Sequence, residues 1–242
     1  MNKVIRLLFF CTLGVYSQNK GIITYSVSKV KIDTQKYFEG KKDNPELKKM
    51  VNSFINTKDE LIYLLYFNAD ESIFFKSKKL NLPNRKEKLL DILAGNGVYY
   101  VNLNDKKVLH QKEFGGELFL VQSNFFKWTL TQDVKIIKNY KCYKAIGVKT
   151  VENSKGIFKK KVVAWYAPSI NINFGPKEYT GLAGAILELN DSDLMYSVRK
   201  IDLNTKKEIK IKKPKKGKKL TDVEFELMTK KLFYERNWKQ RN

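Results

Sequence analysis

Short runs in which apolar and polar residues alternate recur along most of the chain. The first is GIITYSVSKV at residues 21–30, where every second side chain from Ile23 to Val27 is large and apolar. A period of two predicts a strand with one buried face. Comparable runs, several of them denser in apolar residues, are at 60–67, 72–76, 97–102, 107–111, 117–122, 128–130, 134–137, 140–149, 161–166, 187–190, 194–203 and 205–213. Turn residues separate them at intervals of roughly 8–12 residues, which is typical of an all-β domain.

Two stretches have a helical period instead. Asn44-Pro45 is a typical helix start, and apolar residues then recur at helical spacing up to Ile55, so we expect an amphipathic helix over residues 45–56. Thr221-Asp-Val-Glu has the spacing of a capping box and predicts a C-terminal helix over residues 221–231.

Strands that follow one another with few helical connections favour antiparallel pairing. We therefore expect a mainly β protein, built as a curved antiparallel sheet or open half-barrel with two short covering helices. No repeat or linker divides residues 18–242, so we expect one β-rich domain. Within it, a Lys-rich loop near 210–219 would join the last strand to the C-terminal helix.

Residues 1–17 have the order of a signal peptide. Lys3 and Arg6 precede an apolar run over residues 7–15, and small residues stand at −3 and −1 before Gln18. The apolar run is too short to cross a bilayer of about 30 Å as a helix. We expect export, with the mature chain starting at Gln18.

The Cys and His content limits the kinds of covalent link and metal site that the chain can form. The chain of 242 residues has two Cys and one His, and removal of the leader leaves Cys142 as the single thiol. An internal disulfide is then impossible, and a Cys/His metal site has too few ligands. We expect no metal and no cofactor.

The charge is strongly positive, with 47 Lys plus Arg against 25 Asp plus Glu. Almost all of the excess is Lys, whereas base readout relies on bidentate Arg, so we expect no nucleic-acid partner. The densest run is at 210–219 and includes Lys212, Lys213, Lys215 and Lys216. Two interpretations stay open: a solvated loop, or a contact surface for an anionic membrane surface or an acidic envelope protein.

No catalytic constellation stands out. The chain has no G-x-S-x-G motif, and the neighbours of His110 include the cations Lys107 and Lys112. The acidic pairs Asp70-Glu71 and Asp191 with Asp193 are at predicted turns, where solvated carboxylates are the usual case. We expect a non-enzymatic protein, and a carboxylate-based hydrolase is the least favoured alternative.

Residues 173–189 read NFGPKEYTGLAGAILEL and are the most distinctive segment. They resemble the GLPGLI family of exported proteins of Gram-negative bacteria, with GLAGAI at 181–186 in the place of the family motif. Ala183 and Ala185 depart from that motif. Further similarity is at Gly21–Tyr25, Trp128, Tyr140–Ala145, Ala164–Tyr166 and Gly175-Pro176. The resemblance implies a periplasmic or outer-membrane-associated protein, and it implies no activity, because none is established for the family.

The same segment has a physical interpretation of its own. Gly175, Pro176 and Gly181 interrupt regular structure, and Gly184 allows another backbone or a ligand to approach closely. The segment is either a tight buried connection or a loop that contacts a ligand. If it is tightly packed, Gly184 should have a positive φ or a neighbouring backbone against it. The candidate residues are Gly175, Pro176, Gly181, Leu182, Gly184 and Trp165.

Three functions follow from these expectations. The leading hypothesis is a non-enzymatic cell-envelope protein that binds an apolar or amphipathic ligand in the curved sheet. The second is an interaction module for an outer-membrane transporter or secretion partner, and the third is a hydrolase. A large apolar cavity would favour the first, a filled core with exposed apolar residues the second, and polar groups converging in a cleft the third.

Overall fold

A computed structural model describes residues 20–29, 45, 60–77, 90–91, 93–153 and 156–241. The predicted leader at 1–17 and, apart from Pro45, the predicted helix at 45–56 lie outside these residues. The strands are β1 (Lys20–Lys29), β2 (Leu61–Asn68), β3 (Glu71–Lys76), β4 (Val98–Asn102), β5 (Lys107–Phe114), β6 (Glu117–Asn124), β7 (Thr129–Ile137), β8 (Tyr140–Asn153), β9 (Gly156–Ala167), β10 (Ala185–Asp191), β11 (Leu194–Leu203) and β12 (Lys218–Thr221), followed by the helix α4 (Asp222–Arg241).

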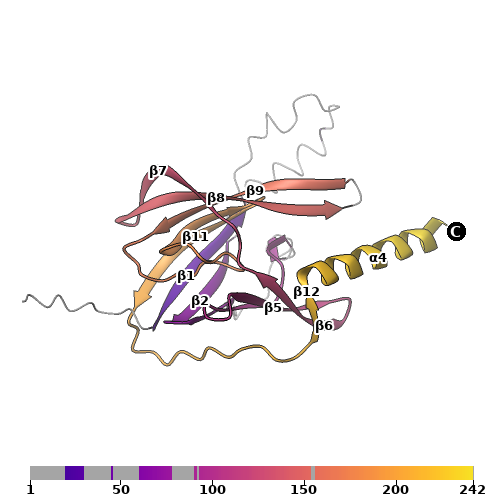
Figure 1. Ribbon diagram of the computed structural model, residues 1–242, viewed down its shortest axis with the longest axis horizontal. Helices are drawn as coiled ribbons and strands as arrows, with labels where there is room; N and C mark the ends of the chain where they lie inside the picture. The colour runs from indigo at the N-terminus through magenta and orange to yellow at the C-terminus, as the bar shows by residue number, and fades with distance from the viewer. Residues whose placement is uncertain are drawn as a thin grey trace, which may run out of the picture.

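The twelve strands form one sheet in the order β12-β6-β5-β4-β3-β2-β1-β11-β10-β9-β8-β7. Neighbouring strands are antiparallel except for β12, which runs parallel to β6. The sheet is strongly curved and stays open, and the long β8–β9 hairpin extends past its body (Figure 1). The predicted fold class, mainly β with an open curved sheet, is confirmed.

Local sequence explains where several elements begin and end. The Asn102 side-chain oxygen accepts the backbone N–H groups of Asn104 and Asp105, which closes the predicted β4–β5 hairpin. At α4, Thr221 and Glu224 form a reciprocal capping box: the Thr221 N–H donates to the Glu224 carboxylate at 2.7 Å, and the Glu224 N–H donates to Thr221 Oγ1 at 3.2 Å.

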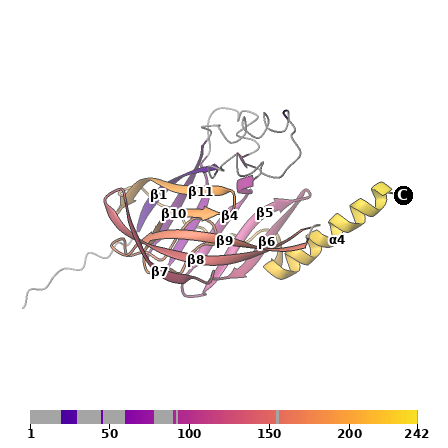
Figure 2. The same cartoon turned by 90° about the horizontal axis from the view of Figure 1, so that it is seen from above.

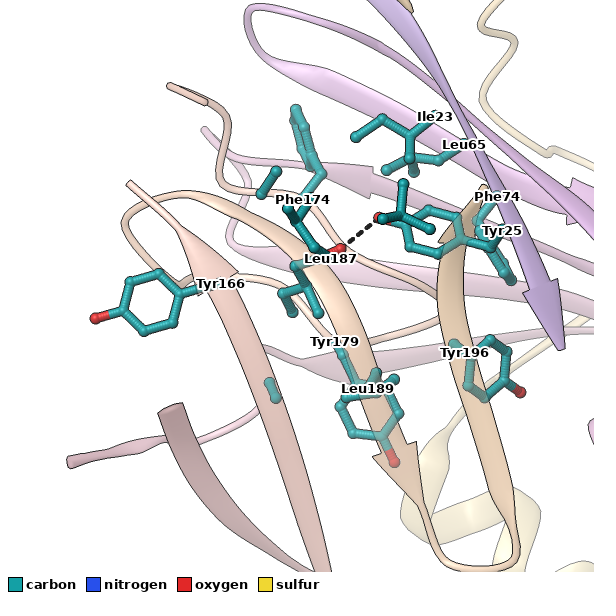
Figure 3. Close-up of a cluster of buried hydrophobic side chains, with 14 of the residues drawn as sticks. Ile23, Tyr25, Leu65, Phe74, Tyr166, Phe174, Tyr179, Leu187, Leu189 and Tyr196 are labelled. Carbon is teal, nitrogen blue, oxygen red and sulfur yellow. Dashed lines mark hydrogen bonds between the residues drawn. The ribbon is translucent and has the colours of Figure 1, made fainter. Parts of the chain in front are cut away.

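The main core is on the concave face of the sheet. In β1, Ile23, Tyr25 and Val27 have no exposed surface, as the alternation predicts. Residues 168–184, which connect β9 to β10 and are called the insertion below, pack against this face. Figure 3 shows Phe174 and Tyr179 of the insertion among side chains of the sheet. The chain thus fills the concave face with its own backbone and side chains.

Three elements differ from the expectation. Residues 128–137 contain one bulged strand, β7, where we expected two strands and a turn, because the pairing with β8 continues across an irregularity between Leu130 and Val134. Residues 205–213, predicted to alternate as a strand, join no strand ladder in the described part of the chain, and neither do residues 214–217. Side-chain contacts hold that segment in place of backbone pairing. Helix α4 packs on the sheet through its first turns only, with Phe225 against Phe119, and then runs away from the sheet (Figure 2).

Candidate functional site

Two of the three glycines in the insertion, Gly175 and Gly184, stand where a side chain does not fit. Gly184 has φ +151°, and a Cβ there would lie 2.4 Å from the Ala167 carbonyl oxygen. A Cβ at Gly175 would lie 2.5 Å from Cδ1 of Ile186. Gly184 therefore meets both conditions expected of a tightly packed connection. Pro176 is also buried, so the N-terminal part of the motif belongs to the core.

Hydrogen bonds fold the motif back on itself. The Asn173 side chain donates to the Leu182 carbonyl at 3.0 Å, and its own carbonyl accepts the Gly181 N–H at 3.0 Å. Gly181 has φ +88° and is exposed, whereas Leu182 is buried. The Gly184 N–H donates to the Leu182 carbonyl at 2.8 Å, which closes a three-residue turn around Ala183.

Trp165 is not part of this arrangement. It lies on β9 between Ala164 and Tyr166, whose side chains are buried, so the alternation of the strand directs it to the other face. There the Lys135 ammonium lies 4.4 Å from the centre of the Trp165 ring and pairs with Glu188 at 2.6 Å. The structure separates Trp165 from the glycine-containing candidates.

Two ion pairs join charged side chains of the insertion to charged side chains of neighbouring strands. Lys177 pairs with Asp191 at 3.3 Å, with side chains 11% and 7% exposed, and Lys149 pairs with Glu178 at 2.9 Å. Burial alone would raise the pKa of Glu178, but Lys149 and Lys177 lower that pKa to about 2. Sequence analysis took Asp191 for a solvated turn carboxylate, and this is wrong because Asp191 is buried and paired with Lys177. It did not single out Lys149, Lys177 or Glu178, because the paired residues are 14 and 29 positions apart.

A cavity of about 440 Å³, called the inner cleft below, opens beside these pairs. Its lining includes Tyr99, His110, Lys112, Phe126, Lys149 and Glu178, from β4, β5, the β6–β7 connection, β8 and the insertion. Residues of α4 complete the lining at one side. Polar groups from distant parts of the sequence therefore converge here.

His110 is held neutral in the inner cleft. Its Nε2 is 2.9 Å from the Asn96 carbonyl oxygen, so this nitrogen carries the proton, and its ring stacks on Tyr99 with centroids 3.8 Å apart. Burial lowers the pKa of His110 to about 4, and Lys112 nearby acts in the same direction. Because its hydrogen bond goes to a backbone carbonyl, His110 is not paired with a hydroxyl or thiol nucleophile.

The Lys-rich segment lies against the outer, convex face of the sheet. Residues 205–217, called the strap below, are held there by Ile211, which packs on Tyr100, Leu109 and Leu120. The Gln111 side chain donates to the Lys216 carbonyl at 2.8 Å. The solvated-loop interpretation is thus too simple, since the strap is attached to the sheet at several points.

The four lysines singled out from the sequence are all exposed on the strap. They are Lys212, Lys213, Lys215 and Lys216. Lys213 pairs with Asp105 at 3.3 Å, with both side chains about half exposed.

A groove of about 720 Å³, called the outer groove below, lies between the strap, β12 and the outer face of β5 and β6. The apolar side chains of Leu109 and Leu120 line it, and so do the cationic side chains of Lys213, Lys215 and Lys219. Leu220 borders the groove through β12, but its side chain packs on Phe119, Val121 and Phe225 on the opposite face. Glu224 also lines it, but its carboxylate is engaged in the capping box with Thr221. Sequence analysis missed the groove because Leu109 and Leu120 alternate as ordinary strand residues.

The following statements about metal sites and membrane-spanning helices apply only to the part of the chain that the structure describes. There, no three His, Cys, Asp or Glu side chains gather closely enough to hold a metal ion. No helix among the described residues has the length and apolar character needed to span a membrane. Cys142 is a buried free thiol, and burial raises its pKa, so it is poorly suited to act as a thiolate nucleophile.

Comparison with known proteins gives a match to one family model over a short part of the chain, and no activity. Residues 153–188 match the model of a family described as "Protein of unknown function (Porph_ging)". The match runs from the end of β8 through GLAGAI, so it covers the most distinctive segment of the sequence. No curated protein matches the chain.

Two solved structures of PNGF-II, in the C2 and P21 space groups, are 17% and 18% identical to the chain, each with a TM-score of 0.49. Each alignment covers 87% of this chain and 32% or 33% of that protein. The chain thus spans about a third of the length of these proteins.

Proposed function

We propose that this chain is a non-enzymatic cell-envelope protein that binds an amphipathic anion in the outer groove. The observation that carries the proposal is the pairing of an apolar lining, Leu109 and Leu120, with the ammonium groups of Lys213, Lys215 and Lys219. An apolar tail would lie on the leucines, and an acidic head group would face the lysines. The insertion occupies the part of the inward side at β1 and β10, where the buried apolar side chains gather, so an apolar tail has no place there.

The charges of the groove support an anionic head group. Lys215 and Lys219 have no ion-pair partner among the described residues, and Lys213 shares its charge with Asp105 across a solvated pair. Each lysine near an anionic group contributes about 1 kcal/mol at low salt. Each CH₂ group of the tail that leaves water contributes about 0.8 kcal/mol. Neither contribution is large alone, so the proposal requires a ligand that has both parts.

Calorimetric titration with laurate and with dodecyl maltoside, below their micelle concentrations, tests this pairing. The two ligands have the same length of tail, but only laurate is anionic. We expect laurate to bind roughly 10- to 100-fold more tightly, which corresponds to about 1.4–2.8 kcal/mol. Replacing Lys213, Lys215 and Lys219 together by Gln should abolish that preference.

A matched control replaces Lys159, Lys161 and Lys200, which are exposed on β9 and β11, by Gln. This variant has the same net charge as the groove variant and should retain the preference for laurate. Equal loss of binding in both variants would mean that net charge, and not the groove, attracts the ligand.

The envelope location is part of the proposal and is supported by the leader-like residues 1–17. N-terminal sequencing of protein recovered from the periplasm should begin within two residues of Gln18. Recovery of the chain with Met1 in place would contradict it.

An interaction module is the second candidate. It is favoured by the filled concave face together with exposed apolar side chains on β7, an end strand of the sheet: Leu130 is 61% and Ile136 is 67% exposed. An envelope partner would cover these residues. Cross-linking from position 136 in intact cells should then capture one defined protein, and random capture would count against this candidate.

A further inference from the structure

The inner cleft has a different chemistry from the outer groove and lies on the opposite face of β5 and β6. Its residues on β5, His110 and Lys112, alternate with Leu109 and Gln111 on the outer face. The two cavities are therefore separated by the thickness of the sheet, and a ligand in one makes no contact with the other.

Lys112 brings an uncompensated cation to the inner cleft. Its ammonium lies 3.7 Å from the centre of the Phe225 ring, and it has no carboxylate partner within ion-pair distance among the described residues. Contact with an aromatic face stabilises a cation by about 0.5–2 kcal/mol, but it satisfies none of the three N–H donors. Those donors are available to an anionic group of a ligand.

Neutral polar side chains bring acceptors to the same cleft. They are Ser123, Asn124 and Thr150, whereas the Glu178 carboxylate accepts from Lys149 at 2.9 Å and its Oε2 is buried without accessible surface. The cleft thus offers a donor group at Lys112 and hydroxyl and amide acceptors to one ligand.

We propose that the inner cleft binds a small hydroxylated monocarboxylic acid. The ligand carboxylate would accept hydrogen bonds from Lys112, and ligand hydroxyls would donate to the neutral polar side chains of Ser123, Asn124 and Thr150. A volume of about 440 Å³ accommodates a ligand of sugar size.

The acidic residues at the α4 side of the cleft set a limit on the ligand. Asp222 and Glu226 line it one helical turn apart, so they repel a group with two or more negative charges. This disfavours phosphate esters and polyanions and favours a single carboxylate. The ligand class therefore differs from that of the outer groove in having hydroxyl groups in place of an apolar tail.

Titration of the full chain with D-glucuronate, D-glucose and hexanoate, followed by protein NMR shifts, tests the proposal. Glucuronate has both groups, glucose has the hydroxyls alone, and hexanoate has the carboxylate alone. We expect glucuronate to bind at least about tenfold more tightly than either of the others, with Kd near or below about 1 mM. The largest shifts should be at residues that line the inner cleft.

Variants distinguish a specific site from general attraction. Lys112→Gln should weaken glucuronate binding about tenfold, Lys112→Arg should largely restore it, and Lys200→Gln on β11 should leave it unchanged. Ser123→Ala should weaken binding of glucuronate but not of hexanoate. A thermal melt of each variant checks that it is folded.

The proposal fails if glucuronate binds no better than glucose or hexanoate, or if Lys112→Gln binds it as tightly as the parent. Failure here would leave the outer groove unaffected, because laurate binding is measured separately and responds to different lysines.

Discussion

Gly184 is the residue at which backbone conformation and packing act together. A side chain there would have both an unfavourable φ of +151° and a Cβ 2.4 Å from the Ala167 carbonyl oxygen. Gly184→Val should lower the free energy of unfolding by about 1–3 kcal/mol. Thermal melts measure this, and a variant that melts within about a degree of the parent would contradict the packing described for the insertion.

Ala183, the next residue, should respond in the opposite direction. It is exposed, its φ is not positive, and its N–H has no protein acceptor in the described part of the chain. A three-residue turn with negative φ at its centre suits proline, so Ala183→Pro should raise the free energy of unfolding by about 0.4–1 kcal/mol. A lower melting temperature than the parent would show that the proline ring disturbs Leu182.

His110 makes stability depend on pH in a defined window. Its folded pKa is lowered from 6.5 to about 4, mainly by burial. Between these pH values the unfolded chain therefore binds more protons than the folded chain. The stabilisation is complete above about pH 6.5 and is lost as the pH falls towards 4.

Thermal melts of the parent and of His110→Gln at about pH 7 and pH 5.5 test this, since most carboxylates stay ionised in that interval. Acidification should lower the melting temperature of the parent more than that of the variant. The comparison is clean because the chain has one His. Parallel losses in the two proteins would show that His110 titrates normally.

The structural roles of some single residues could be predicted from the sequence, and those of others could not. The need for glycine at position 184 could be predicted from the sequence, because a side chain is rarely tolerated where another backbone approaches closely. The role of Glu178 could not be predicted, because Glu178 stands in a stretch with no period and its partner Lys149 lies on another strand. Trp165 was grouped with the motif by proximity in sequence, yet strand alternation sends its side chain to the other face.

Among the elements, the strap shows how side chains can attach a segment that has no strand partner. Ile211 packs on Tyr100, Leu109 and Leu120, whereas Ile209, also half-buried, belongs to none of the apolar clusters in the described residues. Ile211→Ser should therefore release the strap from the sheet, and Ile209→Ser is the matched control.

Limited trypsin digestion measures this release at Lys212, Lys215 and Lys216, since Pro214 blocks cleavage after Lys213. We expect Ile211→Ser to be cleaved there several-fold faster than the parent, because opening of the strap becomes more frequent. Equal cleavage of the parent and the Ile211 variant would show that Ile211 does not hold the strap.

Elements with a strong period were the ones that the sequence predicted well. The strands from β1 to β6 follow alternation and turn residues, and the capping box marks the start of α4. The path of the insertion could not be predicted. Its residues pack on strands that are distant in the sequence, and they have no repeating pattern. Alternation also misled at the strap, where Ile209 and Ile211 resemble a strand but the backbone joins no ladder.

For the whole molecule, the decisive feature is that the insertion fills the concave face and leaves two cavities of different character. One is the outer groove, with leucines and lysines, and the other is the inner cleft, with polar groups of both signs. A curved sheet alone suggested a ligand on its inner side. The packing of the insertion shows why we propose the site for an apolar tail on the outer face instead.

The central claim is that the outer groove binds an amphipathic anion, and photolabelling with a diazirine-bearing long-chain fatty acid tests it most directly. After irradiation and digestion, label that laurate competes away should be on peptides containing residues 109–122 or 213–224, at groove-lining positions such as Leu109, Leu120, Gln122 and Pro214. Competed label on residues 168–184 in place of these peptides, or label that laurate does not displace, would contradict the claim.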